Sequence, residues 1–226
     1  MANKEPPKLK KEASGPQPPA HPKIPGISAK AFNVIKFILG VLLLPFVYSV
    51  SSSFLKELSL INPDFQRVFW KGVITFTIIY LFVYEPAVIY QKGHRLVEII
   101  FSFFAPFVKV APYLLPVYTI IIFIFYLLLS QIVNSPAFFN LFLFTFGFTL
   151  ILHLVFSAKT VRSKQGDFLR ANYIFGLSFV YIVNVFLASL CMNVVFKEFS
   201  LVNFLNNSLL AAKEIFTLLF RQLFLS

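Results

Sequence analysis

A short segment near the middle of the chain combines a histidine, an arginine and a glutamate at helical spacing. Gly93-His94-Arg95-Leu96-Val97-Glu98 places His94 and Glu98 four positions apart, and side chains at i and i+4 share one face of a helix. An imidazole and a carboxylate on one face could converge on a single ion. Zinc bound at His94 and Glu98 is therefore one open interpretation, although no cofactor is the leading expectation.

The same segment departs from the zinc-hydrolase pattern at the positions that would carry the chemistry. A His-Glu-x-x-His metallopeptidase needs a second histidine at i+4 and a glutamate, the general base, directly after the first histidine. In this chain Glu98 stands where the second histidine would be, and Arg95 stands where the general base would be. Because a guanidinium keeps its proton and cannot accept one from water, hydrolysis by this route is not expected.

The composition indicates a membrane protein. Of the 226 residues, 58% are hydrophobic and only 13% are charged, with a mean hydropathy of +0.80, whereas soluble proteins are about one quarter charged. Residues 110–152 contain no Asp, Glu, Lys, Arg or His, about twice the roughly 20 residues that a helix needs to cross a bilayer. Soluble enzymes and nucleic-acid-binding proteins are therefore excluded. Cys191 is the only cysteine, which excludes an intramolecular disulfide or a Cys-rich zinc site.

Apolar segments separated by short polar connectors predict an all-α, polytopic membrane protein with about five transmembrane helices. The predicted crossings are residues 32–51, 68–90, 112–131, 137–157 and 171–196, within a transmembrane domain over 31–200. Residues 201–226 form a separate C-terminal element. Polar residues recur there every three or four positions, which is typical of an amphipathic helix at the membrane surface. A sixth crossing is the alternative.

The N-terminal segment, residues 1–30, is predicted to be a disordered, basic, Pro-rich tail. Residues 1–27 hold seven of the 14 prolines together with Lys, Ser and Gly, too little apolar surface to offset the entropy of ordering. No cleavable signal peptide is expected, because apolar character begins only near Ala31.

The distribution of charge predicts the orientation. Seven lysines against two glutamates give residues 1–36 a net charge of +5, while residues 91–109 carry +2, residues 158–170 carry +3 and the alternate connectors are neutral. Because basic loops remain in the cytoplasm, the N-terminus is expected on the cytoplasmic side. The lipid bilayer is then the first expected partner.

Two of the ionisable residues within the predicted crossings are candidates for a function, because a charge at membrane depth is costly. Glu85 precedes Pro86 near the basic end of the second crossing, and His153 lies inside the fourth. Glu85 could instead pair with Lys92 or Arg95. His153 could ligate a metal or form a hydrogen bond to a neighbouring helix.

Three stretches resemble a group of bacterial polytopic membrane proteins described as site-2-protease-like metallopeptidases. Residues 84–94 resemble the group's Pro-x-x-x-Tyr-x-x-Gly-His-Glu sequence, and residues 111–119 resemble its Ala-Pro-Tyr-x-x-Pro-x-Tyr-Thr sequence. Residues 153–184 resemble its later hairpin and following span. The resemblance covers roughly residues 68–190. It implies a shared membrane fold and the bacterial inner membrane, and, since only His94 of the His-Glu-x-x-His motif matches, a pseudoenzyme.

Three functions remain open. The leading interpretation is a non-catalytic integral membrane protein that binds another membrane protein or a peptide, with Lys92 and Arg95 as part of a charged island. The first alternative is a membrane-embedded metallopeptidase-like hydrolase, with a metal held by His94 and Glu98 together with His153 or Asp167. The second is a proton- or ion-coupled transporter component that uses Glu85 and His153.

Overall fold

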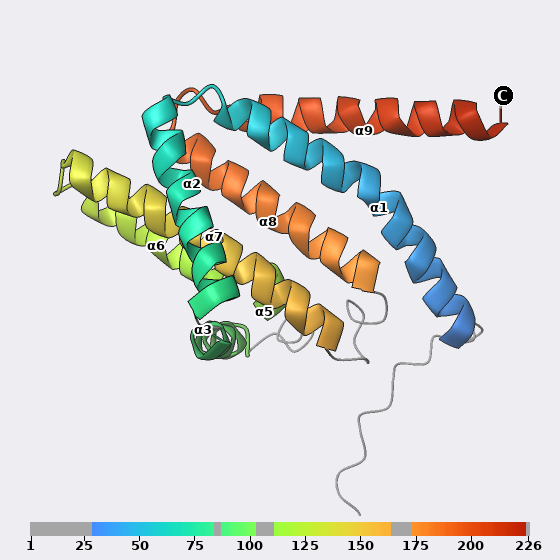
Figure 1. Cartoon of the computed structure of the whole chain (residues 1–226), viewed down its shortest axis with the longest axis horizontal. Coiled ribbons are helices and arrows are strands. Elements are labelled where there is room, and N and C mark those ends of the chain that lie inside the picture. Colours follow the sequence, from blue (N-terminus) through green and yellow to red (C-terminus); the bar gives the residue numbers. More distant parts are fainter. Residues whose placement is uncertain (1–28, 84–86, 103–110, 164–172, 225–226) are drawn as a thin grey trace, which may run out of the picture.

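The computed structural model describes residues 29–83, 87–102, 111–163 and 173–224, and in these ranges it is helical without a β-strand (Figure 1). The elements are α1 (Ala29–Leu58), α2 (Pro63–Ile78), the π-helix η1 (Ile79–Val83), α3 (Ala87–Ile100), α5 (Ala111–Leu114), α6 (Val117–Leu129), α7 (Pro136–Ser163), α8 (Tyr173–Val195) and α9 (Leu201–Phe224). The predicted all-α class is confirmed for this part of the chain. Residues 1–28 of the predicted N-terminal tail lie outside the described residues, and its last two residues, 29 and 30, begin α1.

Three described helices are long and apolar enough to cross a membrane. They are Val34–Leu58, Pro136–Arg162 and Tyr173–Val195, which correspond to the first, fourth and fifth predicted crossings. A fourth crossing would exist if Pro63–Phe82 and Ala87–Ile100 together formed one bent span. The predicted count of about five or six is therefore not confirmed.

The second predicted crossing, residues 68–90, is not one straight helix. The apolar segment that begins in α2 ends with η1, and α3 runs at 118° to it. Pro86 stands between the two in the sequence, and a proline has no N–H with which to continue a helix. The prediction gave this residue too little weight.

The third predicted crossing, residues 112–131, is interrupted as well. Pro116 occupies the N-cap of α6, and α6 itself has 13 residues, fewer than the roughly 20 that span a bilayer. The short helix α5 precedes the break. The interruption leaves backbone carbonyl groups at the end of α5 without helical partners.

Aromatic side chains fill the core between α1, α2, α7, α8 and the start of α9. Phe146, Phe199 and Phe204 are almost completely buried there. Beyond this core α9 leaves the other helices, and its C-terminal end projects past α1 (Figure 1). The last two turns of α9 are accordingly exposed, and α9 is not among the helices long and apolar enough to cross a membrane.

Candidate functional site

The break between α5 and α6 brings together two histidines that the sequence singled out. The ring of Tyr90, in α3, lies between them, with ring centroids 6.2 Å from His94 and 6.0 Å from His153. Tyr113, the third residue of α5, contacts His94 edge-on at 5.0 Å. The site is thus built from α3 and α5 together with α7, whose His153 is 40 positions from Tyr113.

His153 contacts the backbone of α5, beside the helix break. The side chain is buried, and its Nε2 lies 3.1 Å from the carbonyl oxygen of Tyr113. Ser157, one turn further along α7, donates to the same oxygen at 3.3 Å and lies 3.1 Å from Nε2. Because a carbonyl oxygen only accepts hydrogen bonds, the contact with Tyr113 is a hydrogen bond in the tautomer that has its proton on Nε2. In that tautomer Nε2 cannot bind a metal.

A third side chain completes the capping of the break. Asn184 in α8 donates from Nδ2 to the carbonyl oxygen of Leu114 at 3.2 Å, and to that of Val180 at 2.8 Å. In hydrocarbon a backbone carbonyl without a partner costs several kcal/mol. His153, Ser157 and Asn184 therefore act together to stabilise the interrupted helix.

His94 and Glu98 form a separate pair on α3. Nδ1 of His94 lies 3.3 Å from Oε1 of Glu98, with 20% and 45% of the two side chains exposed. In the described ranges no three His, Cys, Asp or Glu side chains are placed to hold a metal ion. Nδ1 of His94 lies against the Glu98 carboxylate and Nε2 of His153 against the Tyr113 carbonyl, so the described residues show no ligand set for zinc and a zinc site stays a prediction.

Little space remains between the two histidines. The cavity there measures about 10 Å³, with Tyr90, His94, Pro112 and His153 among its lining residues, room for one water molecule at most. No substrate of the size of a peptide fits at this position in the described conformation.

Two of the remaining predicted site residues lie apart from this cluster. Lys92 and Arg95 are exposed on the outer surface of α3. Glu85 and Asp167 lie outside the described residues, so their roles as an ion path or as a metal ligand remain predictions.

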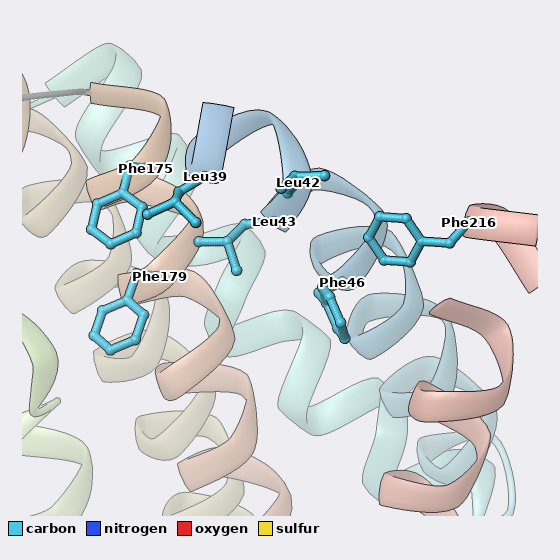
Figure 2. Close-up of a pocket in the computed structure, with 7 residues that line it drawn as sticks. All are labelled: Leu39, Leu42, Leu43, Phe46, Phe175, Phe179 and Phe216. Carbon is cyan, nitrogen blue, oxygen red and sulfur yellow. The ribbon is translucent and has the colours of Figure 1, made fainter. Parts of the chain in front are cut away.

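A larger hollow was not predicted. An open groove of about 540 Å³ runs between α1, α8 and α9 (Figure 2). It is lined by Leu39, Leu42, Leu43, Phe46, Phe175, Phe179 and Phe216. The α1 residues of the groove follow the i, i+3, i+4, i+7 spacing of one helix face. Because α1 is apolar on all sides, this spacing could not be recognised as a groove from the sequence.

Comparison with known proteins gives no relative: the chain matches no protein-family model, no curated protein and no solved structure.

Proposed function

We propose that the protein is a non-catalytic integral membrane protein that binds an apolar transmembrane helix of another membrane protein in the groove between α1, α8 and α9. The apolar lining of the groove is the observation that supports this function. The wall of the groove consists of leucine and phenylalanine side chains from α1, α8 and α9 (Figure 2). Helices associate within a bilayer through close packing of such shaped surfaces, because burial of apolar area gives no advantage there.

The polar cluster at the helix break supports a non-catalytic role. His153 and Ser157 are engaged with the Tyr113 carbonyl, and the cavity beside them has room for one water molecule at most. We further propose that the resemblance to site-2-protease-like proteins reflects a shared membrane scaffold. Residues 111–119 and 153–184, which carry two of the resembling stretches, meet at this break and hold it together.

We also propose that the protein lies in a bacterial inner membrane, as the resemblance implies, with its N-terminus in the cytoplasm. The orientation is supported by the charge distribution combined with the helix order. The start of α1, the end of α7 and the start of α8 lie at one end of the bundle (Figure 1), and these are the ends next to the basic segments 1–36 and 158–170. Basic segments on one side are the usual mark of the cytoplasmic face.

Photo-crosslinking tests the proposed binding function. Benzoylphenylalanine would replace Phe179 or Phe216 in the groove, and Leu128 of α6 as a control, which is 66% exposed but lies outside the groove. Irradiation in the native membrane should yield a protein adduct of the same mass at both groove positions, and none at the control position.

A groove-filling variant makes the test specific. Leu43→Trp should remove the adduct at Phe216, because the indole occupies the space between the helices, while Leu128→Trp should leave it unchanged. Adducts with lipid alone at both groove positions would contradict the proposal, as would protein adducts that are equally strong at Leu128.

A further inference from the structure

The helix α3 presents a fixed face to the rest of the protein. Tyr90, Gly93 and Val97 are its buried residues. Tyr118 of α6 donates from its hydroxyl to the carbonyl oxygen of Ile89 at 2.6 Å. A Cβ at Gly93 would lie 2.7 Å from the Tyr118 ring, so the glycine allows this close approach. These contacts fix the rotation of α3 about its own axis.

With that rotation fixed, the exposed surface of α3 divides into two unlike sides. At 3.6 residues per turn, one side carries five exposed apolar residues, Val88, Ile89, Leu96, Ile99 and Ile100, with Lys92 among them. The other side carries polar groups, namely Gln91, His94 and Glu98. A helix with one apolar side, one polar side and a third side packed on protein is suited to the boundary between hydrocarbon and water.

The position of α3 agrees with such a boundary. Its 14 residues are too few to cross a bilayer, and it is bent by 118° from the segment that begins in α2. Figure 1 shows it nearly end-on at the end of the bundle where α7 terminates and α8 begins. The helix therefore lies across the bundle end rather than along it.

Two cations accompany the apolar side. Lys92 lies one turn from Val88 and Leu96, and Arg95 lies one turn from Ile99. Among the described residues neither cation has a carboxylate within ion-pair distance, since the Glu98 carboxylate lies against His94 instead. Long basic side chains can lay their stems along apolar surface and extend their charges to the level of the lipid phosphates.

We propose that α3 lies in the membrane interface and binds anionic phospholipid headgroups through Lys92 and Arg95. Val88, Leu96 and Ile99 then insert among the acyl chains, and Gln91 and Glu98 face water. A basic side chain near an anionic surface contributes about 1 kcal/mol, which corresponds to about fivefold in affinity per residue. This site is separate from the groove, so either proposal can fail without the other.

Lipid selectivity of the full-length protein is the first test. Native mass spectrometry in detergent would compare binding of dioleoylphosphatidylglycerol with that of dioleoylphosphatidylcholine. The double variant Lys92→Gln, Arg95→Gln should lose at least fivefold of the preference for the anionic lipid. The matched control Lys56→Gln, Lys197→Gln removes two exposed charges at the opposite end of the bundle (Figure 1) and should retain the preference. An equal loss in both pairs, or no loss in the first pair, would overturn the proposal.

The placement of α3 is tested separately with fluorophores. Ile99→Cys and Gln91→Cys would each be labelled in vesicles of equal parts of the two lipids; the natural Cys191 is buried and reacts poorly. Brominated acyl chains should quench the label at position 99, and aqueous iodide the label at position 91. Iodide quenching at both positions would place α3 in water, as expected for a docking surface for a soluble protein, and would overturn the proposal.

Discussion

The carboxylate of Glu57 accepts a hydrogen bond from the backbone N–H of Ser200 at 3.1 Å, across 143 positions of sequence. Glu57 is almost completely buried at the end of α1, and Ser200 directly precedes α9. The next amide, that of Leu201, donates to Oδ1 of Asn193 at 2.9 Å. These bonds satisfy amides that the start of a helix leaves without partners. They fix the point from which α9 extends to carry Phe216 into the groove.

Substitutions of Glu57 should therefore loosen α9 in a graded way. Glu57→Gln keeps an oxygen acceptor but loses the charge at the helix N-terminus, and should cost about 0.3–1 kcal/mol. Glu57→Leu leaves the half-buried Ser200 amide without its carboxylate partner and should cost about 1–3 kcal/mol. Thermal unfolding in detergent measures both losses. Glu198→Leu is the control, because Glu198 is exposed and lies in the connector that contains Ser200. A Glu57→Leu protein as stable as that control would refute the role of Glu57 in anchoring α9.

The crossing of α2 and α7 depends on two glycines. A Cβ at Gly72 would collide with the backbone carbonyl of Phe144, and a Cβ at Gly147 with that of Phe69. Overpacking of this kind costs typically about 1–3 kcal/mol, which should exceed the gain of about 1 kcal/mol in helix propensity from alanine. Gly72→Ala and Gly147→Ala should each lower the unfolding temperature.

Gly93→Ala provides the comparison for these two variants. Its Cβ would meet the ring of Tyr118, a side chain that can move, rather than a backbone carbonyl. Its loss of stability should be smaller than that of Gly72→Ala. Equal losses in all three variants would show that the backbone approach between α2 and α7 is not the cause.

The three long helices could be predicted from the sequence because each contains an uninterrupted apolar run. The broken segments could not, because length and hydropathy alone gave Pro86 and Pro116 too little weight. The partner of His153 is a backbone carbonyl 40 positions away, and no residue type in the sequence marks such an acceptor. The residue type of His153 allowed either a metal ligand or a hydrogen bond to a neighbouring helix, and the structure shows His153, together with Asn184, hydrogen-bonded to backbone carbonyls at a helix break.

The capping role of His153 can be separated from a chemical role by two substitutions. The amide nitrogen of His153→Gln can still donate to the Tyr113 carbonyl, whereas His153→Leu leaves Ser157 as that oxygen's remaining side-chain donor. If capping is the function, the glutamine variant should unfold close to the parent, and the leucine variant should lose about 1–3 kcal/mol. Thermal unfolding and groove crosslinking measure the two effects. Loss of crosslinking in the glutamine variant at parental stability would indicate a direct role for the imidazole.

Both ends of α9 should lie on the same side of the membrane. A crossing would bring Lys213, Glu214 and Arg221 to or near the hydrocarbon, at about 2.5–3.5 kcal/mol for a charge at the helix centre. Asn203→Cys and Gln222→Cys place labels at exposed positions near the two ends of the helix. A membrane-impermeant maleimide, applied to oriented vesicles, should modify both variants from the same face, and the parent with its buried Cys191 gives the background. Modification from opposite faces would instead establish α9 as a further crossing and would require that its polar stripe be covered by a partner.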